Sequence, residues 1–429
     1  MRRLREEAAG RGRVTRWREL VRAVGLVVVA SLLGAAGVIV AVDLGASEPA
    51  AVVVGAMVVV SVTGLAVWRW TRRRDMVGPG SGRAGVVRFA TRTSAAMGLG
   101  ALAFLVPADL PGQPVGPGIR VDDGVTLAVR IHARPNEGAR ASGSAGRPPV
   151  VVVHGGPGAP LTRTEERVVV GTITDRTVVV YDQVGAGRST RLERPSGYTS
   201  RRAVDDLAAV VDHVAEETGS RRVTLLGYSW GAQISALYAA ERPDRVAGLA
   251  LLSPGALPIA GRPERVTGPQ ARLAAIDEVR LNLVALRPRN LFIYALTQVD
   301  PDAARWFVGD AEADARFTEL FRLSGPGLAC DPDRPVDVPE GLGHFANQVP
   351  AADPQPVRLD EAAVDRLRGQ RVLVLRGECD YLPREDALTY EEHLPGTRLV
   401  EVDGAGHAVL TERTDVVRGS LEEFFSRIR

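Results

Sequence analysis

The sequence predicts an α/β protein with a mostly parallel β-sheet, an inserted helical lid and preceding transmembrane helices. Three features of the 429-residue chain lead to this prediction. Strand-like apolar runs alternate with helix-like segments from residue 119 onward, which is the pattern of a parallel sheet with helices on both faces. This alternation is interrupted over residues 256–358, and long uncharged runs precede residue 110.

The N-terminal region, residues 1–110, is predicted to contain two or three transmembrane helices. Residues 23–42 and 49–68 are each uncharged over 20 residues. At about 1.5 Å per residue, a helix of this length just crosses a hydrocarbon core about 30 Å thick. A removable signal peptide is the alternative for the first run, but the second run follows too closely to favour it.

The third apolar stretch, residues 93–108, decides the topology. Its 16 residues are few for a span, so it either crosses the membrane or lies in the interface. Eight arginines in residues 1–22 and seven in residues 69–92 place both segments in the cytoplasm by the positive-inside rule. We expect the third stretch to span. The chain is then a multi-pass cell-membrane protein with everything after Asp109 extracellular; without that span, this part is cytoplasmic.

The predicted sheet domain combines residues 119–255 with residues 359–429 and follows a Pro/Gly-rich linker at 111–118. Continuous β-branched runs are typical of buried parallel strands. The predicted strands are 119–121, 126–132, 149–154, 176–182, 223–226, 246–252, 371–375 and 399–402. Helices are predicted at 202–217, with Thr199 or Ser200 as the cap, at 232–240 and at the C-terminus. We interpret residues 256–358 as a lid over the carboxyl ends of the strands, where open α/β sheets bind ligands.

The composition argues against several classes of function. A net charge of +2 argues against nucleic acid as a main partner. The two cysteines are too few for a disulfide scaffold and too far apart for a C-x-x-C redox or zinc motif. The chain also lacks an H-E-x-x-H zinc-protease motif. No metal is therefore expected, and the composition does not indicate the oligomeric state.

The pentapeptide GYSWG at 227–231 is the first chemical signal. It follows an apolar strand-like run and precedes a predicted helix, which is the context of a nucleophile elbow. Such a turn lifts the hydroxyl of its serine, here Ser229, clear of the sheet edge. By itself the pattern could be a plain Gly/Ser turn, so its partners matter.

A nucleophilic serine needs a base and a group that orients the base. His407 follows the last predicted strand, and Asp380 follows the strand at 371–375. The order Ser, Asp, His is the one expected of an α/β-hydrolase. We therefore predict a triad of Ser229, Asp380 and His407, with Glu378 as the alternative acid.

An oxyanion hole needs two backbone N–H groups directed at the developing charge. Trp230, directly after Ser229, is predicted to supply one of them. The HGGPG segment at 154–158, which follows a predicted strand, should supply the other. Gly156 is the preferred donor in this loop and Gly155 is the alternative.

Three motifs in order carry a family resemblance: HGGPG at 154–158, DQVGAGRS at 182–189 and GYSWG at 227–231. Over about residues 119–429 the chain resembles the proline iminopeptidase family of α/β-hydrolases. The resemblance implies an α/β-hydrolase fold and a lidded serine exopeptidase that removes an N-terminal residue, often proline, through an acyl-enzyme. It implies no metal and no cofactor. Val184 and Tyr228 depart from the family, which has arginine and glycine there.

The resemblance also implies that acidic side chains in the lid read the free amine of the substrate. The acidic residues available in this lid are Asp300, Asp302, Asp310, Glu312, Asp314 and Glu319, none of which matches the family pattern. The expected partners are a small peptide or acyl substrate and the lipid bilayer. An esterase or lipid hydrolase on the same fold is the alternative function, and a non-catalytic membrane module is a third.

The two cysteines lie at informative places. Cys379 precedes the predicted acid Asp380, and Cys330 lies late in the lid. Both should face one cleft, so a disulfide between them is geometrically plausible. It would persist only if the domain is extracellular. Two free thiols are the alternative.

Overall fold

The computed structural model describes residues 110–121, 124–133, 147–262, 267–334 and 336–428, together with isolated positions between Val29 and Leu65. The chain divides into two compact units, residues 1–108 and 109–429.

The first unit is described at few positions, all of them helical, within 29–37 and 55–65. The two groups approach closely at Gly34, where an added Cβ would lie 2.5 Å from Val59 Cγ2 and 3.2 Å from the Gly55 carbonyl oxygen. No helix in the described part of the chain combines the length and the apolarity that crossing a membrane requires. Apart from these isolated positions, the predicted spans at 23–42, 49–68 and 93–108 lie outside the described residues, so they remain predictions.

The second unit contains an eight-stranded sheet with the order β1-β2-β4-β3-β5-β6-β7-β8. The strands are β1 (Gly118–Arg120), β2 (Thr126–His132), β3 (Val150–Val153), β4 (Val178–Tyr181), β5 (Val223–Tyr228), β6 (Val246–Leu252), β7 (Val372–Gly377) and β8 (Arg398–Val402). β2 runs antiparallel to β1 and β4, and every other pairing is parallel. The predicted mostly parallel α/β sheet is thus confirmed.

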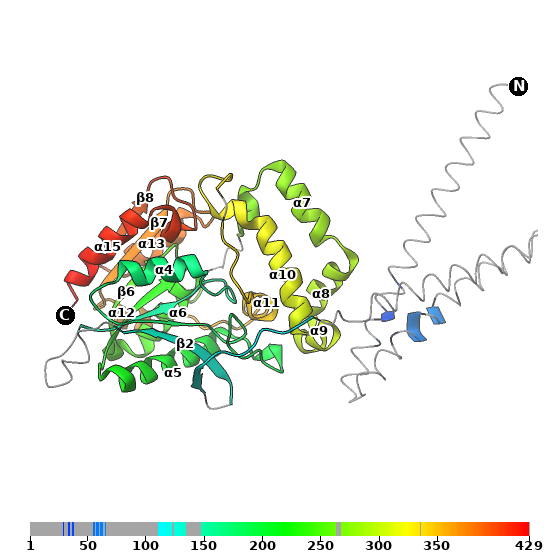
Figure 1. Cartoon of the computed structure of the whole chain (residues 1–429), viewed down its shortest axis with the longest axis horizontal. Helices are drawn as coiled ribbons and strands as arrows, with labels where there is room; N and C mark the ends of the chain where they lie inside the picture. Colours follow the sequence, from blue (N-terminus) through cyan, green and yellow to red (C-terminus); the bar gives the residue numbers. More distant parts are fainter. Residues whose placement is uncertain are drawn as a thin grey trace, which may run out of the picture. The chain divides into compact units, whose positions relative to one another are not determined.

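Helices cover both faces of this sheet. Figure 1 shows α4 (Arg163–Thr172) and α15 (Thr414–Ser426) over one face. The other face carries α5 (Ser200–Thr218), α6 (Trp230–Glu241) and α12 (Glu361–Leu367). α13 (Arg384–His393) contacts β7 and β8, and α14 (Val409–Glu412) contacts α4. The strands β3, β4 and β6 are buried throughout because they are covered on both faces.

Helix α5 illustrates how the local sequence sets an element. Thr199 has extended backbone angles, and its side chain accepts a hydrogen bond from Arg202 N, so it is the N-cap. Gly219 ends the helix in the left-handed conformation with a φ of 68°, which glycine adopts without steric cost. Between them, apolar residues at helical spacing are buried, among them Val204, Leu207 and Val211.

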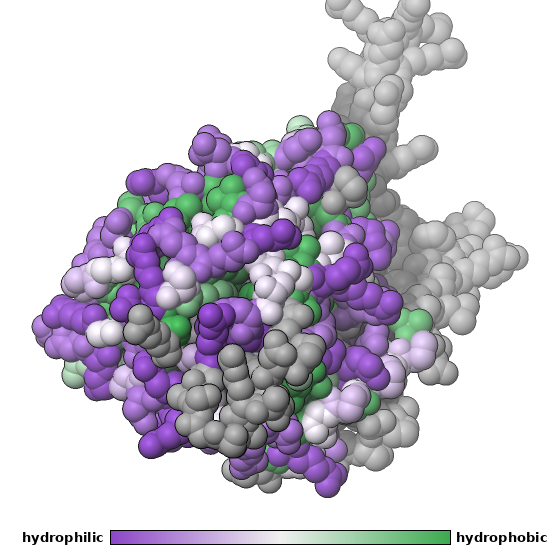
Figure 2. Space-filling model, turned by 60° about the vertical axis from the view of Figure 1, so that its left-hand side comes forward, coloured by the Kyte–Doolittle hydropathy of each residue, from purple (hydrophilic) through white to green (hydrophobic). Residues whose placement is uncertain are grey.

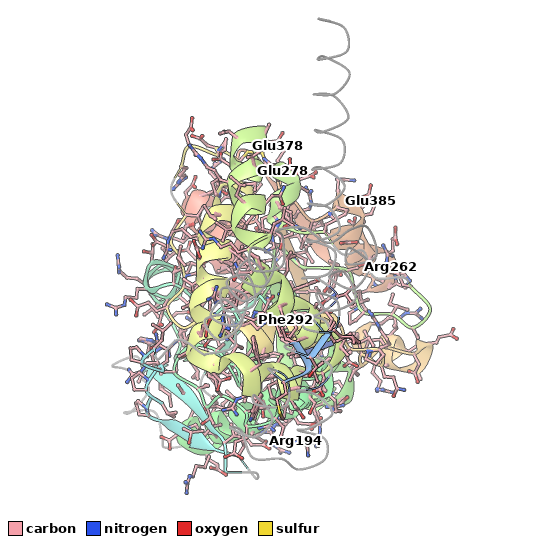
Figure 3. The ribbon with its side chains drawn as sticks, turned by 90° about the vertical axis from the view of Figure 1, so that its right-hand side faces the viewer. Arg194, Arg262, Glu278, Phe292, Glu378 and Glu385 are labelled. Atoms are coloured by element: carbon pink, nitrogen blue, oxygen red, sulfur yellow. A yellow bond between two sulfur atoms is a disulfide. The ribbon has the colours of Figure 1, made fainter. Side chains whose placement is uncertain are left out.

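The segment between β6 and β7 is helical, as the sequence predicts. It holds α7 (Ala275–Ala285), α8 (Pro288–Val299), α9 (Pro301–Val308), α10 (Asp310–Ser324) and α11 (His344–Ala351). These helices lie to one side of the sheet (Figure 1). Within them, Phe292 of α8, labelled in Figure 3, packs edge-on against Phe307 of α9 with 4.9 Å between ring centroids.

Three helices were not predicted from sequence. They are α4, α12 and α13, which are short or have charged residues on most faces. Their apolar positions are too few to establish a helical period. Short 3₁₀ turns complete the unit at Pro195–Gly197, Pro243–Arg245, Pro269–Arg272 and Gly325–Leu328.

Candidate active site

Ser229 lies on the sharp turn between β5 and α6. Its φ of 54° is unusual for a residue other than glycine, and its side chain is almost fully buried at the carboxyl edge of the sheet. The sequence around it allows this turn. An added Cβ on Gly227 would lie 2.6 Å from Ala232 Cα, and one on Gly231 would overlap the Val153 carbonyl oxygen. Both glycines are therefore required by close backbone approach, as in a nucleophile elbow.

His407 and Asp380 meet at the same sheet edge. The distance from His407 Nδ1 to Asp380 Oδ1 is 2.9 Å, and both side chains are buried. An ionised carboxylate can only accept hydrogen bonds, so Nδ1 carries the proton and Nε2 is left with its lone pair. The carboxylate therefore fixes the tautomer that a general base requires.

The acid in this pair is Asp380 and not the alternative Glu378. Burial by itself would raise the pKa of Asp380, but the charge and hydrogen bond of His407 and the Leu382 N–H outweigh it and hold the pKa below its usual value. Glu378 is exposed, and its Oε2 accepts a hydrogen bond from Gly404 N at 3.1 Å. It therefore supports the loop that leads to His407.

His407 is held by three side chains that the sequence analysis did not assign. The hydroxyl groups of Tyr228 and Ser253 donate to its carbonyl oxygen, at 2.8 and 3.0 Å. The rings of Tyr228 and Tyr381 pack against the imidazole, with centroid distances of 5.6 and 4.6 Å. Tyr228, which replaces a glycine of the resembled family, therefore helps to position the imidazole.

The loop predicted to form the oxyanion hole passes beside Ser229. An added Cβ on Gly155 would lie 2.8 Å from Ser229 Cβ, so only glycine fits there. Gly156 has a φ of 113°, which also favours glycine. Trp230 is the first residue of α6, where helix geometry leaves the backbone N–H without a partner inside the helix.

His154 anchors this loop as a neutral imidazole. Its Nε2 accepts a hydrogen bond from Gln183 N at 2.9 Å, so its Nδ1 carries the proton and donates to the Gly155 carbonyl oxygen at 3.0 Å. Gln183 Nε2 in turn donates to the His154 carbonyl oxygen at 2.7 Å. Burial lowers the pKa of His154, which keeps the ring uncharged.

The DQVGAGRS segment at 182–189 is structural in this arrangement. Asp182 accepts hydrogen bonds from the Arg130 guanidinium at 2.9 and 3.2 Å and from Arg188 N at 2.9 Å. The Ser189 hydroxyl accepts from Ala128 N at 2.8 Å and donates back to the Asp182 carbonyl oxygen. The motif therefore closes its own turn on β2, and Gln183 links it to the loop of His154.

A cavity of about 610 Å³ lies between the sheet edge and the lid. Ser229, His407, Gly155 and Gly156 all line it. The lid contributes a mostly apolar wall: Leu281, Leu291, Ile293, Tyr294, Phe317, Leu320 and Phe321. The structure thus brings the predicted serine, the histidine and the loop glycines to one cavity that can hold a small organic substrate.

The six lid acids suggested by the sequence do not line this cavity. Each has another role. Asp300 caps α9, and Asp302 binds Ser196. Asp310 pairs with Arg305, Glu312 with Arg289 and Arg316, Asp314 with Arg191, and Glu319 with Arg287. These carboxylates bond the lid helices to one another and to neighbouring loops, and none of them lines the cavity.

Two other carboxylates line the cavity instead, Glu165 of α4 and Asp337. Glu165 belongs to a capping box, in which its Oε2 accepts from Thr162 N at 2.8 Å and the Thr162 hydroxyl accepts from Glu165 N at 3.1 Å. Burial raises the pKa of the Glu165 carboxyl, and the hydrogen bonds with Thr162 oppose the rise. The T-x-x-E pattern at 162–165 is a sequence signal that could have located both α4 and this carboxylate.

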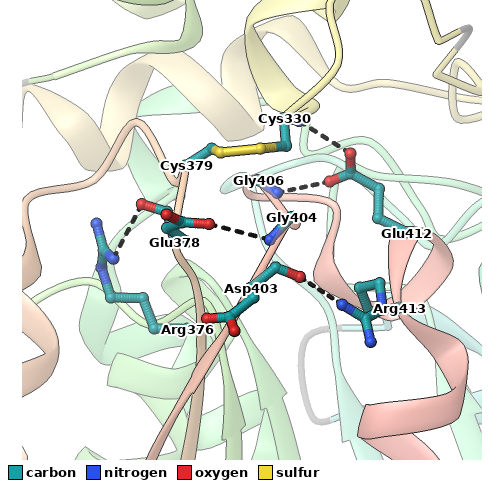
Figure 4. The surroundings of a disulfide bond; sticks show 9 residues. All are labelled: Cys330, Arg376, Glu378, Cys379, Asp403, Gly404, Gly406, Glu412 and Arg413. Atoms are coloured by element: carbon teal, nitrogen blue, oxygen red, sulfur yellow. Dashed lines mark hydrogen bonds between the residues drawn. A yellow bond between two sulfur atoms is a disulfide. The ribbon is translucent and has the colours of Figure 1, made fainter.

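The lid is bonded to the loops that carry Asp380 and His407. Figure 4 shows the disulfide between Cys330 and Cys379, whose Cα atoms are 5.1 Å apart. It also shows Glu412, which accepts hydrogen bonds from Cys330 N at 2.9 Å and from Gly406 N at 2.7 Å. The structure therefore pairs the two cysteines as hypothesised. Within the described residues no cluster of His, Cys, Asp and Glu suited to a metal ion occurs.

Comparison with known proteins gives the family. A sequence profile described as alpha/beta hydrolase fold matches residues 148–414. A proline iminopeptidase of Lactobacillus acidophilus is 34% identical over 107 residues, which are 24% of this chain and 35% of the relative. This chain thus aligns with about a third of the length of such curated relatives.

Solved structures are similar at lower identity. One is a proline iminopeptidase of Mycobacterium smegmatis, with 22% identity, a TM-score of 0.44, and coverage of 72% of this chain and 97% of that one. Another is an esterase of Exiguobacterium antarcticum, with 17% identity, a TM-score of 0.46, and coverage of 73% and 100%. The profile match extends over more than half of the chain and includes all three residues of the predicted triad. The chain belongs to the α/β-hydrolase fold family.

Proposed function

We propose that the protein is a serine hydrolase that acts through Ser229, His407 and Asp380. The observation that carries this proposal is their arrangement: Ser229 on a strained elbow and the hydrogen-bonded His407–Asp380 pair at one cavity. His407 Nε2 takes the hydroxyl proton of Ser229 as the Oγ of Ser229 attacks a substrate carbonyl carbon. The protonated imidazole then gives that proton to the leaving group, and an acyl-enzyme remains.

Water completes the cycle by the same route in reverse. His407 takes a proton from water, the hydroxide attacks the acyl carbon, and Ser229 Oγ leaves with the proton. The tetrahedral intermediates carry a negative oxygen, for which Trp230 N–H and a Gly156 or Gly155 N–H are the proposed donors. Asp380 stays ionised and stabilises the imidazolium. No metal or cofactor is needed in any of these steps.

The type of hydrolase that we propose is an aminopeptidase of proline iminopeptidase type. Beyond the motif resemblance, two features of the cavity support it. Glu165 and Asp337 bring carboxylates to its wall, where a substrate ammonium group could bind. The cation on the same wall, Arg316, is paired with Glu312 at 2.7 Å, so its charge is balanced. The cavity is therefore suited to a cation more than to an anion.

Glu165→Gln tests this assignment with little structural change. Gln can replace Glu in a capping box, so α4 keeps its N-terminal hydrogen bonds while the cavity loses the carboxyl group of Glu165. We expect kcat/KM for aminoacyl anilides with a free amine to fall about 10- to 100-fold, the worth of a hydrogen bond to a charged group. N-acetylated substrates should be cleaved poorly by both forms.

The matched control is Glu340→Gln. Glu340 is an exposed carboxyl that pairs with Arg163 outside the cavity, so kcat/KM should not change. Equal rates on free and acetylated substrates would favour the second candidate, an esterase or lipid hydrolase. The observation that favours this alternative is the apolar lid wall, which suits an acyl chain. If the wild-type protein hydrolyses neither the aminoacyl substrates nor the esters, the proposal of a serine hydrolase is itself wrong.

We also propose that the chain is anchored in the cell membrane and that the hydrolase unit is extracellular. The uncharged runs at 23–42 and 49–68 support the anchor. The close approach at Gly34 and Gly55 supports it as well, because small residues are typical where membrane helices pack. The Cys330–Cys379 disulfide supports the extracellular location. A reporter fused to the C-terminus, assayed with intact cells, tests the topology.

A further inference from the structure

The outer side of the lid exposes a concentration of apolar side chains. In the described part of residues 109–429, ten large hydrophobic side chains are exposed, and seven of them lie between residues 276 and 299. These are Ile276, Val279, Leu283, Leu286, Leu291, Tyr294 and Val299, with exposed fractions of 45% to 78%. By contrast, the face drawn in Figure 2 is mostly hydrophilic, with hydrophobic residues in small groups. An exposed apolar cluster of this kind marks an interaction surface.

Four of these residues form one stripe along α7 and its C-terminal end. Ile276, Val279, Leu283 and Leu286 are spaced by three, four and three residues, which places them on one side of a helix. None of the four lines the cavity, whereas Leu281 and Ala285 on the other side of α7 do. A helix that is apolar on both sides normally lies between two apolar environments. The cavity is one of them, and the other must cover the stripe.

Exposed apolar side chains of α8 also reach the cavity. Leu291 and Tyr294 are 45% and 54% exposed, and both also line the cavity. They therefore lie where the cavity meets the surface. A substrate that enters past Leu291 and Tyr294 therefore passes exposed apolar side chains of the lid.

The amino-acid sequence identifies what can cover this surface. The uncharged run at 93–108 ends nine residues before β1. Nine extended residues span about 30 Å at most. The hydrolase unit therefore cannot lie far from the bilayer in which that run is proposed to end. An exposed apolar helix held this close to a membrane is expected to insert its apolar side into the interface.

We propose that the outward side chains of α7 and α8 form a bilayer-docking surface and that the cavity takes its substrate from that bilayer. The surface comprises Ile276, Val279, Leu283, Leu286, Leu291, Tyr294 and Val299. This proposal rests on the membrane attachment proposed above. It names the substrate class as acyl or peptidyl compounds that partition into the membrane interface.

The docking is tested with the full chain in vesicles of phosphatidylcholine and phosphatidylglycerol. An environment-sensitive fluorophore on Leu283→Cys should shift its emission to shorter wavelength and be quenched by spin-labelled lipid. The matched control is the same label on Glu216→Cys, an exposed position on α5, which should respond only to aqueous iodide. The unsubstituted chain, treated identically, reports any labelling of the native cysteines.

The outcomes separate docking from attachment. One outcome is a chain that floats with the vesicles while iodide quenches the label at position 283 as strongly as the label at position 216. In that case the docking surface is wrong, and the membrane attachment is supported. A label at 283 that neither lipid nor iodide quenches would mean that protein, such as a second copy, covers the stripe, and docking is again wrong. A chain that does not float with vesicles refutes attachment and docking together.

A functional measurement completes the test. The triple variant Val279→Ser, Leu283→Ser, Leu286→Ser changes side chains that do not line the cavity. Hydrolysis of a free-amine amino-acid ester of a long-chain alcohol, embedded in the vesicles, should fall by about tenfold or more, because interfacial binding scales with buried apolar area. Hydrolysis of the short-chain, soluble ester of the same amino acid and the melting temperature should stay the same. An equal loss on both esters, or a loss on neither, would overturn the proposal.

Discussion

Cys330, at the end of the lid, is disulfide-bonded to Cys379, the residue immediately before Asp380. The lid and the loop of the catalytic-acid candidate are therefore covalently joined. Glu412 forms a second link between the lid and the loop of His407, because its carboxylate accepts hydrogen bonds from both Cys330 N and Gly406 N. The lid position and the geometry of the His407–Asp380 pair should accordingly change together.

Breaking the disulfide should destabilise the hydrolase unit. The bond closes a loop with a sequence separation of 49 residues, for which chain entropy gives about 4 kcal/mol. We expect the free energy of unfolding in urea to fall by roughly that amount when reductant is added. The double variant Cys330→Ala, Cys379→Ala should show the reduced stability and no response to reductant. A wild-type protein that reductant does not affect would contradict the bond.

Ser229→Ala should abolish hydrolysis without unfolding the protein. The side chain is small, and Ala keeps its Cβ in place on the elbow. Triad residues act as a unit, so kcat should fall by about 10⁴-fold or more. His407→Ala should give a comparable loss. The measurement is turnover of a chromogenic ester by purified variants whose melting temperatures match the wild type. Near-normal turnover by Ser229→Ala would exclude it as the nucleophile.

Asp380→Asn should be far more damaging than Glu378→Gln. An amide at 380 can donate to His407 Nδ1 and so favours the wrong tautomer, which costs about 10⁴-fold in kcat in a triad. In the described part of the chain, the Glu378 side chain accepts one hydrogen bond, from Gly404 N, so its change should cost about tenfold or less in kcat because one hydrogen bond is weakened. The opposite order of effects would show that Glu378 is the acid.

Tyr228→Phe should lower kcat modestly. The change removes the hydroxyl that donates to the His407 carbonyl oxygen but keeps the ring packed on the imidazole. Losing a buried hydrogen bond of about 1 kcal/mol predicts a kcat decrease of about fivefold with little change in KM. The matched control is Tyr390→Phe, since no described residue pairs with the buried Tyr390 hydroxyl. Equal effects of the two changes would deny Tyr228 a positioning role.

Asp314 should make stability depend on pH in the direction opposite to most carboxylates. Burial raises its pKa from 3.8 to about 6, although Arg191 and the His344 N–H oppose the rise. The folded protein therefore holds this proton more tightly than the unfolded chain does. That stabilisation is complete only well below the unfolded pKa of 3.8 and is lost as the pH rises through about 6.

Asp314→Asn removes this titration. Between pH 4 and pH 7, the free energy of unfolding of the wild type should fall relative to the variant by about 2 kcal/mol. Urea denaturation at the two pH values measures the difference. Parallel pH profiles for wild type and variant would contradict the raised pKa.

The local sequence by itself determined the features that depend on short-range geometry. Steric and hydrogen-bonding preferences within a few residues predict the elbow at Ser229, a helix cap at Thr199 or Ser200 and the buried β-branched strands. The structure then places the cap at Thr199. The location of Ser229, Asp380 and His407 at one edge of the sheet could be predicted as well. Each residue follows a parallel strand, and the carboxyl ends of parallel strands share one edge.

Contacts between distant residues were decided only by the tertiary structure. Whether a lid acid faces the cavity or an arginine depends on how α8 and α10 pack, so the sequence could not assign a role to the lid acids, and Glu165 was missed. Tyr228 donates a hydrogen bond to His407, although 179 positions separate them in the sequence. Glu412 accepts one from Cys330 N, at a sequence separation of 82. Such pairs have no local sequence signature, because their geometry exists only once the sheet has aligned its strand ends.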